Sequence, residues 1–461
     1  MISNIKNKIN GLLRDSDFNE IFRGSSISFF LRIAGLVIGY LLTFFIARKY
    51  GADSLGEYVL AITVLKIFVV FGKLGIDTTA IRFFSSFATK KRWSSMLNLN
   101  IQMIQIITIS SILSSFLMYF LSHQISEIVN IDSSILQLLS FFITPMSLFV
   151  LHYQSLRGLK KIAMFSFFFR VSITLFTLII LYIIHQIYLI EDVHQYNVPL
   201  YAFLISILIV SILSFFSLRY AIYKNISYDS VVEKINDSTI IKISIPLMFA
   251  QSAQFIMSWT DKLMLGAIKS PNVVDGLVAD TKTEVGIYHA AFRLSMFAAI
   301  SLMAINSIAA PKFAEMYSRN DLKGLKKVSF QSTKLIFWTT LPLLIIFFMF
   351  PEFILGLFGP KFAKYGVSAF ILLSIGRFVS SISGSVGNIL QMTGNQNIYF
   401  IILSLGAILN IGLNFILIPK YGILGAAIAT MSSLIFWNLT MVLFIKKKFG
   451  FFTFYLPFMR L

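Results

Sequence analysis

Long apolar stretches follow one another along the whole 461-residue chain, and short polar segments separate them. A stretch of about 20 apolar residues is the length of helix that crosses the hydrocarbon core of a bilayer. Because that core offers no water to backbone amides and carbonyls, each stretch is expected to be helical. The pattern predicts twelve membrane-spanning helices, at 25–46, 57–76, 97–120, 134–156, 163–186, 199–222, 240–260, 285–308, 329–350, 366–390, 397–418 and 422–445.

The polar segments between these spans differ in charge. If the N-terminus is cytoplasmic, clusters of Lys and Arg such as those at 90–92 and 446–448 also face the cytoplasm, whereas the outer segment 123–133 has neither residue. Cytoplasmic loops of membrane proteins carry an excess of Lys and Arg. The alternation therefore predicts a multi-pass protein of the cytoplasmic membrane with both termini in the cytoplasm.

The order of the segments predicts five parts. A polar linker interrupts the spans at their midpoint, and the motif Gly56-Glu57-Tyr58 of the second span is echoed by Gly286 and Tyr288 in the eighth. An echo of this kind predicts two lobes of six helices each, with the cargo site between them. The predicted parts are an amphipathic cytoplasmic segment at 1–24, an N-terminal lobe at 25–223, a linker at 224–239, a C-terminal lobe at 240–445 and a cytoplasmic tail at 446–461.

Composition narrows the class of protein. The chain is 57% hydrophobic and only 13% charged, which fits an all-α polytopic membrane protein. It has no cysteine, so it has no disulfide and no cysteine-based metal site. The net charge of +19 is concentrated in the inner loops, which disfavours nucleic acid as a partner. The predicted connections are too short for a soluble catalytic domain of about 50 residues or more, so we predict no enzyme.

Five cations inside predicted spans are selected as candidate site residues, namely Arg32, Lys66, Lys73, Arg293 and Arg377. A buried Arg or Lys costs about 2.5–3.5 kcal/mol at mid-bilayer on insertion scales, so such residues usually face a wet cavity or a partner. No Asp or Glu lies as deep in a predicted span. The pattern predicts a cationic cavity for an anionic cargo, with the five cations as substrate contacts.

Polar residues at helical spacing extend this candidate site. Gln251 and Gln254 fall on one face of the seventh span, and Asn388 shares a face with Arg377 in the tenth. The alternative interpretation is ordinary helix–helix hydrogen bonding, which Ser, Asn and Gln commonly provide in membranes. We place these three residues with the substrate-binding candidates.

Two acidic residues at span ends are candidates for coupling to a proton or Na⁺ gradient, namely Asp77 and Asp261. A cation-coupled pump usually holds such a carboxylate well inside the membrane. An ion pair between Asp261 and the adjacent Lys262 is the simpler interpretation. No other cofactor and no metal site are predicted.

Seven short motifs together resemble those of polysaccharide-repeat flippases, the Wzx (RfbX-like) branch of the multidrug/oligosaccharidyl-lipid/polysaccharide exporter superfamily. They are spread over nearly the whole chain and lie at span ends. The motifs are ARKYGADSLGEY at 47–58, GIDTTAIRF at 75–83, LRGLKK at 156–161, DKLMLG at 261–266, VGIYHAAFRL at 285–294, APKFAEMY at 310–317 and IPKYGILGAAIAT at 418–430.

The resemblance implies a V-shaped pair of lobes around a central cavity, like that of multidrug exporters. The implied activity moves an undecaprenyl-pyrophosphate-linked oligosaccharide, such as an O-antigen or capsule unit, from the inner to the outer leaflet of the bilayer. A polysaccharide polymerase and chain-length machinery are the implied partners. No residue set is universal in the family, so the site residues above rest on charge and spacing.

Four other functions stay open at this point. A drug or cation antiporter of the same superfamily would require a deep carboxylate. A lipid II flippase would rest on the same physical principle as a polysaccharide flippase, a cationic cavity for an anionic cargo. A polytopic glycosyltransferase or polymerase would require a large acidic outer loop. The fourth is a scaffold for assembly that transports nothing.

Overall fold

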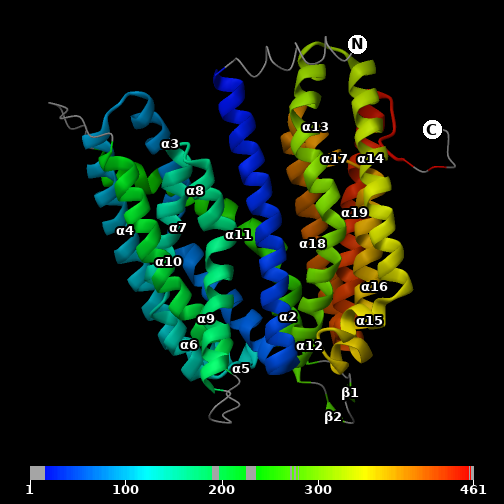
Figure 1. Cartoon of the computed structure of the whole chain (residues 1–461), viewed down its shortest axis with the longest axis horizontal. Coiled ribbons are helices and arrows are strands. Elements are labelled where there is room, and N and C mark those ends of the chain that lie inside the picture. Colours follow the sequence, from blue (N-terminus) through cyan, green and yellow to red (C-terminus); the bar gives the residue numbers. More distant parts are fainter. Residues whose placement is uncertain are drawn as a thin grey trace. The chain divides into compact units, whose positions relative to one another are not determined.

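A computed structural model describes residues 16–188, 197–224, 235–269, 273–274, 277–278, 280–455 and 457. Nearly all of these residues are helical, which confirms the all-α fold class (Figure 1). The β-structure among the described residues is a short antiparallel pair of strands, β1 (Val273–Val274) and β2 (Leu277–Val278). The predicted surface segment at 1–24 lies outside the described residues up to position 15, as does most of the linker at 224–239.

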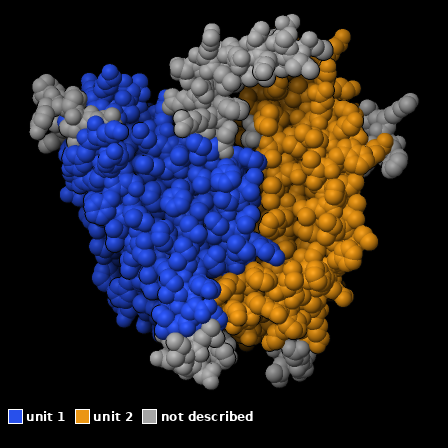
Figure 2. Space-filling model, in the orientation of Figure 1, with its two compact units in different colours: residues 1–42, 64–124, 132–255 blue, residues 43–63, 125–131, 256–461 orange. Residues whose placement is uncertain are grey.

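The chain divides into two compact units, which Figure 2 shows in different colours. Unit 1 comprises residues 1–42, 64–124 and 132–255, and unit 2 comprises residues 43–63, 125–131 and 256–461. Three helices contribute residues to both units: α2 (Ser16–Gly72), α5 (Ser122–Val129) and α11 (Asp237–Ala267).

Unit 1 is built around α7, which packs against α3, α4 and α10, and Figure 1 shows α4, α7 and α10 side by side. Its outer surface is apolar: Ile109, Leu113, Phe116 and Phe120 are exposed along one face of α4, as expected for contact with lipid. Besides its parts of the shared helices, unit 1 contains α3 (Ile76–Thr89), α4 (Trp93–Phe120), α6 (Ser133–Ser140), α7 (Ile143–Gly158), α8 (Ile162–Phe167), the π-helix η1 (Phe168–Ser172), α9 (Ile173–Tyr188) and α10 (Val198–Tyr223).

Unit 2 is built around α16 and α19, which pack against each other. Besides its parts of the shared helices and the two strands, it contains α12 (Thr281–Ser295), the 3₁₀ helix η2 (Met296–Ala299), α13 (Ile300–Ser318), α14 (Leu322–Met349), α15 (Pro351–Gly356), α16 (Pro360–Ser383), α17 (Val386–Met392), α18 (Gln396–Tyr421) and α19 (Ile423–Phe449).

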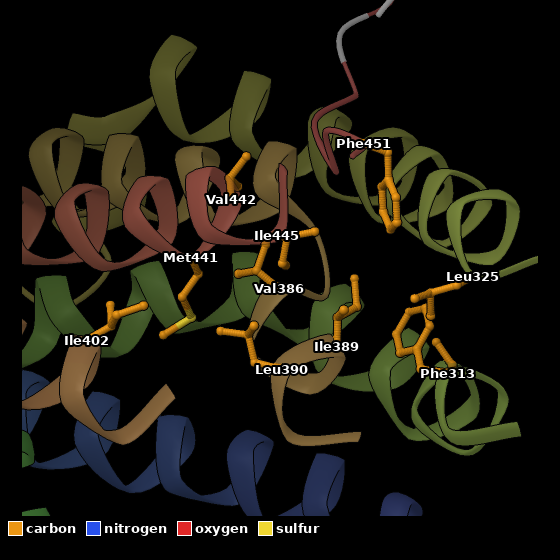
Figure 3. Packing of buried hydrophobic residues seen from close by; sticks show 11 residues of the cluster. Phe313, Leu325, Val386, Ile389, Leu390, Ile402, Met441, Val442, Ile445 and Phe451 are labelled. Atoms are coloured by element: carbon orange, nitrogen blue, oxygen red, sulfur yellow. The ribbon is translucent and has the colours of Figure 1, made fainter. Parts of the chain in front are cut away.

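A hydrophobic cluster at one end of unit 2 joins segments that are far apart in the sequence. Phe313 of α13, Leu325 of α14 and Ile389 of α17 meet Ile445 of α19, and Figure 3 shows these side chains together with Phe451. Phe451 follows α19, and it is 4% exposed. Phe451, just beyond the last helix, is therefore part of the core of unit 2.

Several predicted spans are interrupted helices. The first two spans form one helical run, α2, which changes direction at Gly51, where φ is 87° and a residue with a side chain would be strained. The fourth span is the pair α6 and α7, bent by 46°. The tenth span ends early, because Gly384 with φ 76° separates α16 from α17.

Nine helices in the described residues are long and apolar enough to cross a membrane, or ten if α6 and α7 form one span. One of the nine, Ile27–Gly72, covers two of the predicted spans. The chain is thus a multi-pass membrane protein, and the count of twelve spans stays a prediction, as do the lobe boundaries.

Candidate functional site

A buried carboxylate lies where three helices of unit 2 meet. Asp261 of α11 is 6% exposed and accepts a 2.5 Å hydrogen bond from the hydroxyl of Tyr288 in α12. Thr430 of α19 lies 3.0 Å from the Tyr288 hydroxyl and 3.4 Å from the same carboxylate oxygen. A buried charge is costly unless hydrogen bonds or opposite charges compensate it, and these two hydroxyls supply the hydrogen bonds.

Two cations, Lys262 and Arg377, interact electrostatically with this carboxylate. The ammonium group of Lys262 lies 4.4 Å from the ring centroid of Trp259 and 4.7 Å from that of Phe292. The guanidinium of Arg377 lies 5.6 Å from the same Phe292 ring. Cations are attracted to the faces of aromatic rings, so Phe292 holds two positive charges near each other. Lys262 is therefore held by aromatic rings, and it forms no salt bridge with Asp261 in the described structure.

Two of the five predicted cations belong to this group. Arg377 is attracted by Asp261, and Arg293 adds a further positive charge that acts on Lys262. Arg377 also donates to the thioether of Met296 at 3.0 Å, which is a weak acceptor for a guanidinium. The group beside Asp261 thus comprises three cations, Lys262, Arg293 and Arg377, around the shared ring of Phe292 and this one carboxylate.

A cavity of about 180 Å³ adjoins Arg377 inside unit 2. The Nε atom of Arg377 is buried and has no hydrogen-bond partner among the described residues. Such a group leaves a strong donor unused, so it favours a polar or anionic ligand in the space beside it. The cavity is lined by Ala299, Leu302, Arg377, Ser380, Ser381, Leu434, Trp437 and Asn438.

Two acidic residues of α2 pair with residues in the first turn of α12. Glu57 forms an ion pair with Lys282 at 3.5 Å, and Asp53 accepts a hydrogen bond from Thr283. These contacts tie the middle of α2 to the first turn of α12. These contacts account for Glu57 and Asp53. Glu284 in the first turn of α12 is buried as well, and Asp261 is the carboxylate that contacts the hydroxyls of Tyr288 and Thr430.

The two glycines of the sequence echo lie at this same helix contact. A Cβ atom at Gly286 would collide with the carbonyl oxygen of Ala52, and one at Gly56 would collide with that of Lys282. Each glycine therefore lets its helix touch the backbone of the other. The resemblance between the two motifs reflects a shared packing requirement.

In unit 1 the predicted site residues have different surroundings. Lys73 forms a salt bridge of 2.8 Å with Asp77, four residues further on, and both side chains are buried. This pairing accounts for both charges. Arg32 and Lys66 are half-buried on α2.

Arg170 is a further cation that the sequence analysis missed. It lies in the π-helix η1, within the predicted fifth span, and the charge of Arg32 repels it. Arg170 lies inside an apolar stretch, as the other five cations do, and that position is the signal in the sequence that marks it.

The remaining candidates divide into two groups. The side chains of Gln251 and Gln254 lie outside those that the structure describes. Asn388 is half-buried in α17, beyond the break at Gly384, and it does not line the cavity beside Arg377. The convergence of all candidates on one chamber stays a prediction.

Comparison with solved structures shows which fold the chain has. The fold matches an inward-facing multidrug resistance MATE family transporter of the MOP superfamily, with a TM-score of 0.70 at 14% identity over 92% of this chain and 98% of that one. It also matches the lipid II flippase MurJ in an inward closed conformation, with a TM-score of 0.65 at 18% identity over 93% of this chain and 89% of that one. The expected exporter fold is confirmed.

The chain belongs to the family described as polysaccharide biosynthesis protein, whose model matches residues 21–317. A MatE family model matches residues 246–416. An uncharacterized membrane protein of Methanocaldococcus jannaschii is 24% identical over 438 residues, covering 89% of this chain and 81% of that protein. A probable flippase of Haloferax volcanii, AglR, is 28% identical over 179 residues, covering 38% of this chain and 35% of that protein. The resemblance inferred from the motifs is confirmed.

Proposed function

We propose that this protein is a flippase for a polyprenyl-pyrophosphate-linked oligosaccharide, which in a bacterium is the undecaprenyl-linked form. It moves the glycan head group from the cytoplasmic to the outer leaflet by alternating access. Family membership and the relative named as a probable flippase support this proposal. The observation that carries it is the cationic group of Lys262, Arg293 and Arg377 in unit 2, beside a cavity with an unused guanidinium donor.

The chemistry of the cargo explains the need for these charges. A pyrophosphate loses its hydration when it enters a cavity, and cations replace the lost water. One charge pair at 4 Å is worth about 4 kcal/mol at an effective dielectric constant near 20, before desolvation. Arg offers planar paired donors that suit phosphate oxygens, whereas Lys acts as a point charge. Arg377 and Arg293 therefore suit the head group, with Arg32 and Lys66 as the predicted contacts from unit 1.

We further propose that Asp261 couples transport to a proton or Na⁺ gradient. Its carboxylate is surrounded by hydroxyl oxygens of Tyr288 and Thr430, which are ligands that a hard cation prefers. A proton or Na⁺ at Asp261 would remove the attraction that this carboxylate exerts on Arg377. Arg377 would then be released toward an anionic cargo. Asp77 is a weaker candidate because Lys73 already neutralises it.

The direct test is flipping of a fluorescent polyprenyl-pyrophosphate oligosaccharide in liposomes that contain the purified protein. Arg377→Gln and Arg293→Gln are expected to slow flipping by about tenfold or more, since each removes a charged hydrogen bond of about 1.5–3 kcal/mol. The matched control is Arg319→Gln, because Arg319 is 68% exposed and pairs only with Glu315 on the surface.

Three outcomes separate the proposal from its rivals. Normal flipping by both cavity variants would contradict the cationic-site proposal. Transport of organic cations in place of the glycan would identify an antiporter. Rescue of cells that lack their lipid II flippase, without rescue of cells that lack their polysaccharide flippase, would assign lipid II as the cargo.

A further inference from the structure

Three arginines come together at one end of unit 1. Arg32 lies on α2, Arg157 on the last turn of α7, and Arg170 on η1. The positive charges of Arg32 and Arg157 both repel that of Arg170. In the part of the chain that the structure describes, no salt bridge reaches any of the three, and the sequence from 133 to 188 contains no Asp or Glu.

Aromatic rings hold two of these guanidinium groups. Arg157 lies 5.2 Å from the ring centroid of Phe165, and Arg170 lies 4.9 Å from that of Phe169. The two rings stack on each other, with centroids 5.5 Å apart and planes 11° apart. Each of the two guanidinium groups is therefore held against one ring of a stacked pair. An arginine held by its face keeps the N–H groups along its edge available for oxygen acceptors.

The backbone brings Arg32 to the same place. A Cβ atom at Gly35 would collide with the carbonyl oxygen of Arg170, so α2 and η1 touch there. Arg32 precedes Gly35 by three residues and so lies on the same side of α2. The single turn of π-helix at Phe168–Ser172 is a rare conformation that is often found at functional sites.

Arg170 also has an unused donor. Its Nε atom is buried and has no hydrogen-bond partner among the described residues. Like charges that are brought together without a counter-ion raise the free energy of the folded protein, and a buried donor without an acceptor adds to that cost. An anion with several oxygens would remove both costs.

The surface beside the cluster indicates the kind of anion. Phe169 is 47% exposed and Met164 is 39% exposed, while Lys160 and Lys161 are exposed in the turn between α7 and α8. A ligand that matches this surface has an apolar tail to contact the exposed Phe169 and Met164 and a negative head group to bind the cations. We propose that Arg32, Arg157 and Arg170 form a docking site in unit 1 for the phosphate group of a membrane lipid.

All three arginines belong to unit 1, and binding there does not require that the protein transports the lipid. The shared chemistry is a lipid phosphate. It occurs in bulk anionic phospholipid and in a lipid-linked pyrophosphate, and the experiment below distinguishes these two sources.

The test measures lipid binding to the purified full-length protein in neutral detergent. The probes are fluorescent polyprenyl pyrophosphate, polyprenyl monophosphate and phosphatidylglycerol, with uncharged polyprenol as the blank. The double variant Arg157→Gln/Arg170→Gln should bind phosphorylated lipids about tenfold more weakly, with no change for polyprenol. The matched control is Arg219→Gln, because Arg219 of α10 also lies over aromatic rings, those of Phe215 and Tyr223.

A second measurement distinguishes a binding site from a structural role. Because the three charges repel each other, the double variant should melt at the same temperature as the parent or higher when no anionic lipid is present. Added phosphatidylglycerol should raise the melting temperature of the parent more than that of the variant.

Each outcome has a defined meaning. Weaker binding of all three phosphorylated lipids assigns the site to lipid phosphate in general, and weaker binding of the pyrophosphate alone assigns it to lipid-linked cargo. Unchanged binding by the double variant, or an equal loss in Arg219→Gln, overturns the proposal. Because no transport is measured, these results are independent of the flipping assay on Arg293 and Arg377.

Discussion

The hydroxyl of Tyr288 is the principal hydrogen-bond donor to the buried carboxylate of Asp261, since Thr430 reaches the same oxygen only at 3.4 Å. We expect Tyr288→Phe to lower the free energy of unfolding by about 1–3 kcal/mol, because it leaves a buried acceptor without a strong donor. The measurement is thermal unfolding of the detergent-purified protein.

The matched control for this change is Tyr153→Phe. Tyr153 is also buried, among the rings of Phe149, Phe165 and Phe169, and its hydroxyl makes no hydrogen bond within the described structure. Its loss should change stability by much less. Equal melting temperatures for the two variants would show that the contact between Tyr288 and Asp261 contributes little.

How far the site could be predicted from sequence depends on the distance between partners along the chain. Lys73 and Asp77 are four residues apart, so their salt bridge follows from helix geometry alone. The partners of Asp261 come from α12 and α19, and nothing in the local pattern links position 261 to 288 or 430. Its expected partner was the neighbouring Lys262, whose ammonium group lies over Trp259 and Phe292.

At the scale of the elements, apolar length identified the helices, and backbone detail decided where they break. Gly51 and Gly384 adopt positive φ, which the hydrophobic pattern does not encode. The π-helix at Phe168–Ser172 lies in an uninterrupted apolar stretch, so no feature of the pattern indicated it. The predicted polar stripe from Arg377 to Asn388 assumed one continuous helix, and the end of α16 at Ser383 divides it.

The contact between α2 and α12 depends on glycine. We expect Gly286→Ala to destabilise the protein, since the added methyl group collides with the carbonyl oxygen of Ala52 and forces two backbones apart. Overpacking of this kind typically costs about 1–3 kcal/mol. Thermal unfolding, together with the fraction of protein recovered as monodisperse material, measures the effect.

Gly412→Ala is the control for that substitution. Gly412 lies within α18, and nothing lies within 4 Å of its added Cβ. There, alanine should stabilise the helix by about 1 kcal/mol through its higher helix propensity. If both variants shift stability in the same direction, the close approach of the two helices is not what selects glycine at position 286.

At the scale of the whole molecule, the charges of the loops predict which side of the membrane each one faces. The segment around Lys90 is expected to be cytoplasmic, and the segment 123–133, which has no Lys or Arg, is expected to be outside. The chain has no cysteine, so a single introduced cysteine is the only thiol that can react with a probe.

We therefore predict that Gln124→Cys reacts with a membrane-impermeant maleimide in intact cells, whereas Lys90→Cys reacts only after the cytoplasmic side is opened. Both positions are exposed in the folded chain, so a difference in labelling reports the side of the membrane and not burial. Detergent-solubilised protein, in which both cysteines should react, is the control for thiol reactivity. Labelling of Lys90→Cys in intact cells would show that the topology is the reverse of the predicted one. The end of unit 1 that carries Arg157 and Lys160 would then face outward. In that case the proposed lipid-phosphate site would take its lipid from the outer leaflet.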